Sequence, residues 1–464
     1  MTQPPLIKSR RDVLRAMFLG AAAAGLAACG GGSSRSTSNT TPDNGDTPQP
    51  PQPPVPPATE LPLSPGPLAN IGDLFTSDVD GILIPEGFSI RRVARAGFSP
   101  SLNFTLWHSN PDGGAVFQSD DGGWVYVSNS ESTPGGVGAL RFDANGSITD
   151  NYRILKDTRN NCAGGATPWQ TWLSCEEVRD GLVYECDPFG DADSAVARPA
   201  LGIFNHEAVA VDMPTRTVYL TEDAGDGRLY RYTALGDAPS MNGRQGLNLN
   251  NGLLEVLEIE GFENGGYQDA LSEARQLHKV KWVEVQSPER PQADVRADIA
   301  STGAGAPGTV FKGGEGIWIQ SFTDGRTVAG SSHPLRAVVF FACKGDNRVY
   351  ALDIDNDLIE VVFDNEQLTA VDETPYDDVD NLVVSPAGDV IVAEDGDAMR
   401  LMVMVPNANA KILLQVPGGK SELTGPAFTA DGSRLYFSSQ RGPVNFGIPW
   451  FGTTYELTIP ENFR

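Results

Sequence analysis

Basic residues are scarce in this chain of 464 residues, which has 34 lysines and arginines against 60 aspartates and glutamates. The net charge of −26 at pH 7 argues against a nucleic acid as partner, because a protein that binds a phosphate backbone needs a basic surface. Solubility alone is a sufficient explanation for most of these acids. The excess of carboxylates also fits a calcium-rich exterior or bound cations.

The sequence also lacks an apolar run long enough to span a membrane. The candidate run, in "SRRDVLRAMFLGAAAAGLAAC", is short and consists largely of alanine and glycine. Arg10 and Arg11 precede it, which is typical of a twin-arginine export signal. "LAAC" resembles a lipobox, so we expect residues 1–28 to be cleaved and Cys29 to be lipidated. The mature protein would then lie in the periplasm or on the outer membrane or cell surface of a bacterium, with this lipid as its only membrane contact.

The segment that follows has too little apolar surface to fold. Residues 29–64 are rich in serine, threonine, glycine and proline and end in "PQPPQPPVPPATELP". Such a composition predicts an extended tether. Residues 65–464 have an even composition and form the folded part of the chain.

Cysteine is rare in the folded part, which contains only Cys162, Cys175, Cys186 and Cys343. In an exported protein these residues could form disulfides, and Cys175 and Cys186 could bridge two neighbouring strands. Cys162 lies beside a flexible glycine pair, so a role as a metal ligand competes there. No Ser-His-Asp arrangement and no P-loop is found in the sequence.

Six segments repeat one pattern, in which two short apolar strands flank a turn and are followed by polar residues. The polar ends fall at Asn129, Glu176, Glu222, Cys343, Glu394 and Ser439. Four of the five steps between them are 45 to 51 residues long, which is the length of one four-stranded blade of a β-propeller. The remaining step is long and carries an insertion at about 236–310, in which Tyr267–His278 has a helical pattern. The sequence therefore predicts an all-β fold, a six-bladed β-propeller with a partly helical insertion.

"EGFSIRRVAR", Glu86–Arg95, precedes the first repeat and has the pattern of a strand. We expect it to close the ring as an outer strand against the C-terminal strands. Closure of this kind removes exposed sheet edges.

Propeller geometry brings two sets of residues to one mouth of the central channel. The start of each innermost strand and the end of the next antiparallel strand lie at the same face. The first set comprises Cys162, Glu207, Glu315, Asp380 and Asn381, and the second comprises Glu176, Glu177, Glu222, Asp223, Glu394 and Asp395, with Glu131 nearby. Carboxylates packed in this way repel one another, and bound cations relieve the repulsion.

The ligand types indicate which cations would bind. Oxygen ligands suit Ca²⁺, whereas a thiolate among carboxylates suits a transition metal such as iron. His206 could be a further ligand or a histidine that hydrogen-bonds behind the ligands. Any single carboxylate could instead be a solvated loop acid or a turn cap.

The motifs that carry these acids resemble those of the PhoX-type alkaline phosphatases. The resemblance rests on "VDGILIPEGFSIRRVAR", "NNCAGGATPWQTWLSCEE", "NHEAVAVD", "VYLTEDAGDGRLYRY", "GEGIW", "DNLVVSPAGDVIVAEDG" and "GPAFTADGSRLYF". It implies a six-bladed propeller that holds an iron pair (Fe³⁺), bridged in part by a cysteine thiolate, together with Ca²⁺, and that hydrolyses phosphomonoesters. It further implies that Cys162 is the bridging thiolate and that the carboxylate ligands are Glu177, Glu207, Glu222, Asp223, Glu315, Asp380 and Glu394.

The chain departs from the family where phosphate would be held. Gly313 stands where we expect an arginine, and the adjacent Lys312 lacks the planar fork that holds two phosphate oxygens. Arg159 and Lys344 are the other candidates for phosphate contacts. We therefore expect Gly313→Arg to raise phosphatase turnover.

Two other functions fit the same pattern. A propeller can support calcium-dependent hydrolysis of another substrate, such as a lactone, or it can be a non-catalytic binding module stabilised by metals. The resemblance favours a phosphatase that acts on a small-molecule phosphomonoester. We expect the protein to be a monomer.

Overall fold

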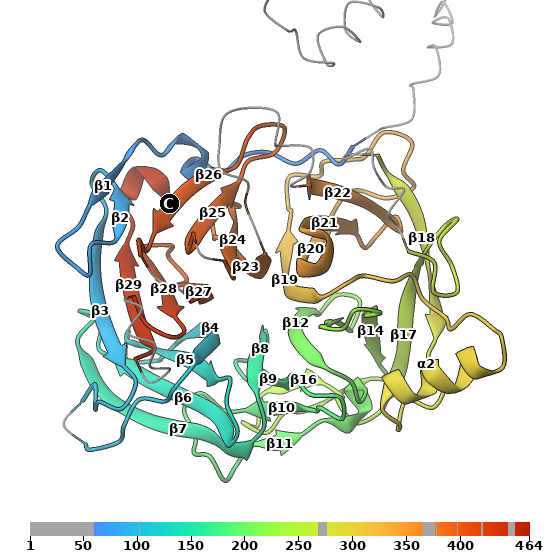
Figure 1. Cartoon of the computed structure of the whole chain (residues 1–464), viewed down its shortest axis with the longest axis horizontal. Helices are drawn as coiled ribbons and strands as arrows, with labels where there is room; N and C mark the ends of the chain where they lie inside the picture. Colours follow the sequence, from blue (N-terminus) through green and yellow to red (C-terminus); the bar gives the residue numbers. More distant parts are fainter. Residues whose placement is uncertain are drawn as a thin grey trace, which may run out of the picture. The chain divides into compact units, whose positions relative to one another are not determined.

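The computed structural model describes residues 60–101, 103–267, 276–364, 376, 378–396, 398–418, 421–443 and 451–464. These residues belong to one compact unit of the chain, Val55–Arg464. They form an all-β, propeller-like arrangement (Figure 1), which confirms the fold class at that level. The signal peptide predicted at 1–28, Cys29 and most of the linker predicted at 29–64 lie outside the described residues. In the described part of the chain, no helix combines the length and the apolar character needed to cross a membrane.

Each of the six repeated segments forms an antiparallel hairpin, as the alternation of apolar strands and turn residues predicts. The hairpins are β4 (Pro111–Gln118) with β5 (Trp124–Ser130), β8 (Asn161–Ala166) with β9 (Trp172–Glu176), β12 (His206–Asp212) with β13 (Thr217–Glu222), β19 (Gly314–Ser321) with β20 (Ala337–Cys343), β23 (Val379–Val384) with β24 (Val390–Glu394), and β27 (Leu423–Phe428) with β28 (Arg434–Ser439). The first strand of each hairpin contacts the first strand of the next hairpin, and β27 contacts β4. These six strands surround the centre of the arrangement in Figure 1.

Outer strands extend the hairpins into larger sheets. Two sheets have the orders β4-β5-β6-β7 and β8-β9-β10-β11, with β6 (Gly135–Phe142), β7 (Ile148–Thr158), β10 (Val183–Cys186) and β11 (Val196–Ala197). A nine-stranded sheet has the order β12-β13-β14-β17-β18-β22-β21-β20-β19, with β14 (Leu229–Ala234), β17 (Gly252–Ile259), β18 (His278–Glu284), β21 (Arg348–Asp353) and β22 (Leu358–Asp364). A six-stranded sheet has the order β1-β2-β26-β25-β24-β23, with β1 (Leu74–Thr76), β2 (Leu83–Pro85), β25 (Arg400–Met404) and β26 (Lys411–Gln415).

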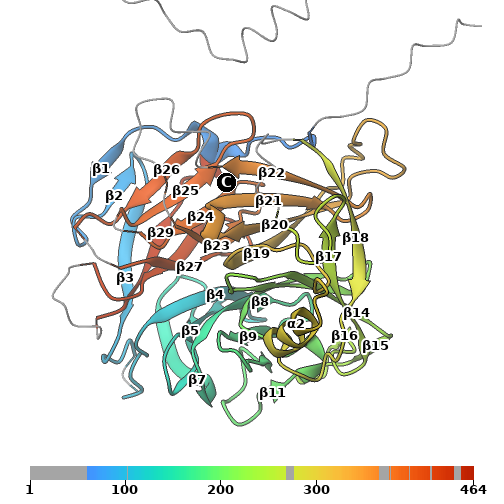
Figure 2. The same ribbon diagram turned by 45° about the vertical axis from the view of Figure 1, so that its right-hand side comes forward.

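The last large sheet closes the ring. Its order is β27-β28-β29-β3, with β29 (Thr453–Thr458) and β3 (Ser89–Arg95). β3 comes from the N-terminal side of the described unit and pairs antiparallel with β29, from Arg95 opposite Thr453 to Ser89 opposite Thr458. In Figure 2 β3 also lies beside β29. The strand predicted within Glu86–Arg95 therefore does pair with C-terminal strands, as expected.

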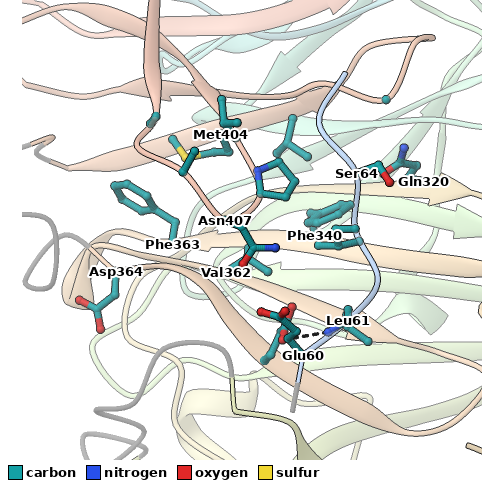
Figure 3. A pocket seen from close by; sticks show the side chains of 18 residues that line it. Glu60, Leu61, Ser64, Gln320, Phe340, Val362, Phe363, Asp364, Met404 and Asn407 are labelled. Carbon is teal, nitrogen blue, oxygen red and sulfur yellow. Dashed lines mark hydrogen bonds between the residues drawn. The ribbon is translucent and has the colours of Figure 1, made fainter. Parts of the chain in front are cut away.

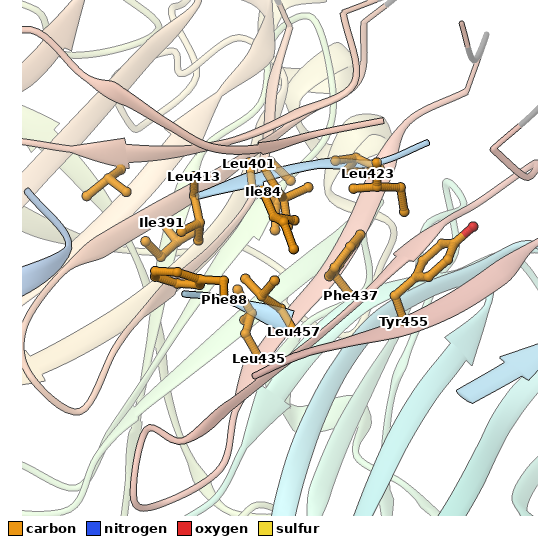
Figure 4. Close-up of a cluster of buried hydrophobic side chains, with 14 of the residues drawn as sticks. Ile84, Phe88, Ile391, Leu401, Leu413, Leu423, Leu435, Phe437, Tyr455 and Leu457 are labelled. Atoms are coloured by element: carbon orange, nitrogen blue, oxygen red, sulfur yellow. The ribbon is translucent and has the colours of Figure 1, made fainter. Parts of the chain in front are cut away.

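Apolar side chains fill the space between neighbouring sheets. Figure 4 shows one such cluster, in which Ile84 and Phe88 from the N-terminal side pack among Leu401, Leu435 and Leu457. Full burial of one side chain of this size contributes about 1.5–3 kcal/mol. The ring closure is therefore held by packing as well as by strand pairing.

The insertion predicted at about 236–310 contains more strand than expected. β17 lies within it and is the fourth strand beside β14, with Leu254, Val256, Leu257 and Ile259 buried. A small hairpin, β15 (Asp237–Pro239) with β16 (Gln245–Leu247), precedes it. Most of the helix predicted at Tyr267–His278 lies outside the described residues, and its last residue begins β18. Further along, an α-helix that was not predicted, α2 (Gln292–Ser301), follows β18.

Short 3-10 helices occupy some of the connections in the described part of the chain. They are η1 (Pro67–Asn70), η2 (Pro199–Leu201), η4 (Lys344–Asp346) and η5 (Glu461–Phe463).

Candidate metal centre

All six innermost strands contain a β-bulge near their start, and in every strand except β27 it directly follows the first residue. In β8, for example, Asn161 pairs with Glu176, and the next regular pair joins Gly164 to Ser174. A bulge of this kind turns the side chains of the inserted residues away from their regular direction. The first residues inside the five bulges are Asp112, Cys162, Glu207, Glu315 and Asp380.

A second set of equivalent residues follows directly after the second strand of each hairpin. Each donates its backbone N–H to the carbonyl of the residue just before an innermost strand, as Glu177 does to Asn160 at 2.8 Å. The set comprises Glu131, Glu177, Asp223, Lys344, Asp395 and Gln440, whose carbonyl partners belong to Asn110, Asn160, Asn205, Gly313, Asp378 and Glu422. The two mouth-facing columns predicted from propeller geometry thus correspond to two observed columns.

The observed strand pairing shifts the alignment of the first repeat by one residue from the alignment predicted from the sequence. Pro111 pairs with Ser130, so Ser130 rather than Asn129 is equivalent to Glu176 of the next repeat. The buried Asn129 instead donates to the backbone carbonyl of Ala163 at 2.7 Å. Since neighbouring residues of a strand point to opposite faces, a shift of one residue changes which side chain faces the channel.

Acids from different sheets meet in four overlapping groups. In each group, ligand atoms of three residues lie within 4.8 Å of one another. The groups are Asp112, Glu131 and Cys162; Cys162, Glu177 and Glu207; Glu207, Glu315 and Asp380; and Asp380, Asp395 and Glu422. Shared members link the groups into one continuous cluster of eight carboxylates and a thiol, which we call the acidic cluster.

The acidic cluster is electrostatically strained in the absence of cations. Burial, with Asp223 and Glu131 nearby, raises the pKa of Glu177 to about 8. Burial, with Asp395 and Glu131 close by, also raises the pKa of Asp380 to about 6, although Lys344 opposes this shift. Burial and neighbouring acids raise the pKa values of the other affected members, Asp112, Glu131, Cys162, Glu207, Glu315 and Glu422. Ionisation of the cluster therefore needs positive charge.

Two carboxylate oxygens in the acidic cluster have no hydrogen-bond partner. They are Oε2 of Glu207 and Oε1 of Glu315, and both residues are buried. The thiol of Cys162 donates to the other oxygen of Glu207 at 3.1 Å. Buried polar atoms without partners are rare and costly, so these atoms fit the coordination of a metal ion.

The protein supplies some positive charge of its own. Lys344 lies against Asp395 and is 3.6 Å from Asp380, and Arg441 donates to Glu422 at 2.9 Å. Burial lowers the pKa of Lys344, but attraction to Asp380 and Glu315 raises it overall. These two side chains cannot balance eight carboxylates.

Of the eight predicted metal ligands, Cys162, Glu177, Glu207, Glu315 and Asp380 meet in the acidic cluster. Asp223 is not a member of the four groups, but it is close enough to Glu177 to hydrogen-bond with it and help raise its pKa. The structure does not bring Glu222 or Glu394 to the cluster. Each is the last residue of its strand, one position before the residue that faces the channel.

Both excluded glutamates are buried against arginines. Glu222 receives hydrogen bonds of 2.9 and 3.0 Å from Arg296, and Glu394 receives two of 2.6 Å from Arg400. A paired arginine satisfies both oxygens of a carboxylate and leaves little capacity for a metal. These arginine partners contradict the prediction that Glu222 and Glu394 are metal ligands.

The residues predicted to contact phosphate are dispersed. Lys344 lies in contact with the acidic cluster, as described above. Arg159 instead pairs with Asp180 at 2.9 Å and with Glu176 at 3.6 Å. The ammonium of Lys312 lies 3.4 Å from the centre of the Tyr267 ring.

His206 also lies away from the acidic cluster. Its Nε2 atom contacts the carbonyl of Gly202 at 3.1 Å, and its ring packs on Phe204. Burial lowers its pKa to about 3, so the ring is neutral. Its Nδ1 atom has no hydrogen-bond partner. The ring is therefore neither placed as a ligand nor hydrogen-bonded to a member of the acidic cluster.

Gly313 has a backbone role that conflicts with the expected benefit of arginine. Its φ of 59° lies in the left-handed region, as do those of the equivalent Asn110, Asn160 and Asp378. These are the residue types that adopt this conformation most readily, and others lose about 1–2 kcal/mol there. A Cβ atom would also lie 3.1 Å from the backbone nitrogen of Gly345. The expectation that Gly313→Arg raises turnover is therefore withdrawn.

Sequence reasoning missed Asp112 and Glu422 and did not assign Glu131 or Asp395 as ligands. A signal for Asp112 was available, because "NPDGG" has the spacing of "NNCAGG" and places an asparagine two residues before the ligand. Glu422 had no such signal, since it stands where the other repeats have asparagine, aspartate or glycine.

The four cysteines of the folded part are free and buried. Cys175 pairs in register with Val183 and Cys186 with Trp172. These positions are three residues apart along the ladder, too far for a disulfide. The disulfide considered for Cys175 and Cys186 is therefore not formed.

A separate apolar pocket lies away from these acids (Figure 3). Leu61, Phe340, Phe363 and Met404 are among its lining residues. The backbone N–H of Leu61 donates to the buried Glu360 at 3.1 Å and so ties the N-terminal segment across it. The pocket therefore lies where the N-terminal segment packs against the strands around Phe340 and Phe363.

Exchanging Glu394 for glutamine tests its exclusion from the site. Glu394→Gln should lower stability, by about 3–5 kcal/mol, because Arg400 loses a buried partner. Metal content should stay the same. Chemical denaturation and elemental analysis measure the two effects, and a loss of metal at unchanged stability would make Glu394 a ligand.

The comparisons with known proteins bear on this geometry. The family model for the alkaline phosphatase PhoX matches residues 128–183 and 178–329, which include Cys162, Glu177, Glu207 and Glu315. The structure of Pseudomonas fluorescens PhoX, in complex with the transition state analogue vanadate, matches with a TM-score of 0.65. The resemblance to the PhoX-type alkaline phosphatases is confirmed. The PhoX match has 16% identity and covers 86% of this chain and 98% of that one.

Two further comparisons carry less information. A gluconolactonase structure from Xanthomonas campestris has a TM-score of only 0.41 at 10% identity, with 86% of this chain and 98% of that one covered. A likeness of that strength is too low to bear on function. No curated protein sequence matches the chain significantly.

Proposed function

We propose that this protein is a phosphomonoesterase that works with metal ions held in the acidic cluster. The observation that carries the proposal is the convergence of eight carboxylates and a thiol at one mouth of the channel, with two buried oxygens unpartnered. The match to the PhoX family model supports phosphate esters as the substrate class.

The donor types favour two kinds of metal. A thiolate flanked by carboxylates, as at Cys162, suits iron as Fe³⁺, and the all-oxygen groups suit Ca²⁺. The proposed ligands are Asp112, Glu131, Cys162, Glu177, Glu207, Asp223, Glu315, Asp380, Asp395 and Glu422. When bound, such metals supply Lewis-acid activation of the ester and of water.

The chain's own residues would orient the substrate. Lys344 is held beside the cluster by Asp380 and Asp395, where its ammonium could contact a phosphoryl oxygen and offset developing charge. Arg159 and Lys312 are weaker candidates for this contact, because their charged groups contact Asp180 and Tyr267, which are not members of the acidic cluster. The small-molecule substrate would enter from the mouth that carries the acidic cluster.

Further features of the proposal concern architecture and location. The nine-stranded sheet would correspond to two blades joined through β18, which gives six blades in total. The twin-arginine motif and the cysteine of "LAAC" support export and a lipid anchor at Cys29, in the periplasm or at the outer membrane or cell surface. We propose a monomer that does not bind nucleic acid.

Hydrolysis of p-nitrophenyl phosphate tests the proposed function. Protein produced with its export signal should hydrolyse this ester, lose activity on chelation and regain it with calcium. A lactone substrate assayed in parallel separates this function from calcium-dependent lactone hydrolysis. Folded, metal-loaded protein that hydrolyses neither substrate would be a non-catalytic binding propeller, and the proposal would then be wrong.

A further inference from the structure

The helix α2 lies in the insertion and reaches the back of the acidic cluster through a buried arginine. Arg296 holds both oxygens of Glu222 at 2.9 and 3.0 Å and also binds Asp226 at 2.9 Å. Tyr230 donates to Glu222 from the same side, at 3.0 Å. Glu222 directly precedes Asp223, so this network fixes the backbone that carries one acid of the site.

The network continues to a second acid. The N–H of Asp223 donates to the carbonyl of Asn205 at 3.1 Å, and the side-chain amide of Asn205 donates to Glu177 at 3.3 Å. Asn205 therefore couples the position of Asp223 to that of Glu177, which is a member of the acidic cluster.

α2 also contacts the other two loops of this network. The N–H of its first residue, Gln292, donates to the carbonyl of Ile203 at 2.9 Å, two residues before Asn205. Asp294, in its first turn, forms an ion pair with Arg179, two residues after Glu177. One short helix thus holds three successive loops at the channel mouth.

We propose that α2 is the element that positions Glu177 and Asp223 for metal binding, with Arg296 as its principal positioning residue. This inference rests on the proposed metal centre. Arg296 acts through Glu222, because its planar guanidinium fixes both carboxylate oxygens and leaves Glu222 unable to turn toward the channel. Residues that orient ligands in this way affect metal affinity without touching the metal.

The test is Arg296→Gln, with two measurements on the full-length protein. Glu177 shares its group with Cys162, so the metal to follow is iron. Iron binding, measured by equilibrium dialysis against ferric citrate and elemental analysis, should weaken about 10- to 100-fold, the usual effect of losing a residue that orients a ligand. Hydrogen exchange of the metal-free protein should become faster at the amides of Glu177 and Asp223. Glu177 lies two residues before Arg179, and the acceptor of the Asp223 amide is Asn205, both in loops that α2 holds. Arg296→Lys keeps the charge but not the fork, so its affinity should be intermediate.

Arg198→Gln is the matched control. Arg198 is also buried and binds the buried Glu185, with an Nε–Oε2 distance of 3.0 Å, but Glu185 belongs to none of the groups of the acidic cluster. The control should lose stability yet keep the parent's iron affinity and the slow exchange of Glu177 and Asp223.

The outcomes separate this inference from the proposed function. Unchanged exchange and affinity in Arg296→Gln would overturn the inference, as would equal losses in Arg198→Gln, which would indicate a general loss of stability. If the parent binds no iron and Arg296→Gln still accelerates exchange at both amides, the metal centre is wrong but the positioning role of α2 stands.

Discussion

Cys162→Ala should lose its transition metal and its phosphatase activity, whereas Cys343→Ala should keep most of both. Cys162 lies in two of the four groups of the acidic cluster, and its thiol contacts Glu207 at 3.1 Å. Removing a residue that merely orients a ligand weakens metal binding about 10- to 100-fold, so removing the thiolate itself should cost more than about 100-fold. Alanine offers no donor to replace it.

Cys343 is the appropriate control because it is also buried but belongs to none of the cation groups. It packs in an apolar cluster that includes Phe341 and Tyr350. Cys343→Ala should therefore cost some packing energy and leave the metal in place. Elemental analysis and turnover of p-nitrophenyl phosphate measure both variants. Equal losses, or a Cys162→Ala protein that keeps its iron, would contradict the assignment of Cys162.

The repeat in the sequence was sufficient to predict the hairpins and the mouth at which acids gather. Alternating apolar residues and turn signals are local, so each hairpin could be placed without knowing its neighbours. The closing strand β3 was also predictable, since Glu86–Arg95 has a strand pattern and no partner within its own repeat.

Individual ligands were harder to predict, because two neighbouring acids at a strand end point in opposite directions. Glu176 and Glu177 illustrate this: only Glu177 joins the acidic cluster, and the sequence does not mark the exact end of the strand. A β-bulge turns Cys162 and Glu207 into the channel. Because a bulge depends on how two strands pair, its position could not be predicted from the sequence pattern either.

Partners distant in sequence explain the remaining differences. In the sequence, Glu222 has the position of a metal ligand. In the structure it is hydrogen-bonded to Arg296, which lies 74 residues later in the chain. Tertiary pairing of this kind leaves no periodic signal in the chain. The same holds for α2, whose contacts with three loops could not be inferred from its composition.

The metal-free protein should become less stable as the pH rises from about 5 to 8. In the folded, metal-free state the pKa of Glu177 is raised from 4.5 to about 8 and that of Asp380 from 3.8 to about 6, first by burial. Between the unfolded and folded pKa values the folded state binds more protons than the unfolded state, so stability falls with pH. For Asp380 alone the loss amounts to about 3 kcal/mol once the pH exceeds its folded pKa. Calcium should reverse this trend, because cations compete with protons for the same carboxylates.

Thermal unfolding between pH 5 and pH 8, with chelator and with calcium chloride, measures this dependence. Stabilisation by calcium should be small at pH 5 and large at pH 8. Glu177→Gln cannot ionise at this position, so it should flatten the decline of the chelated protein, whereas the exposed Asp120→Asn should reproduce the parent. If the stability of the chelated protein instead rises from pH 5 to pH 8, the buried acids do not repel one another in the folded state. The acidic cluster would then have no electrostatic reason to bind cations.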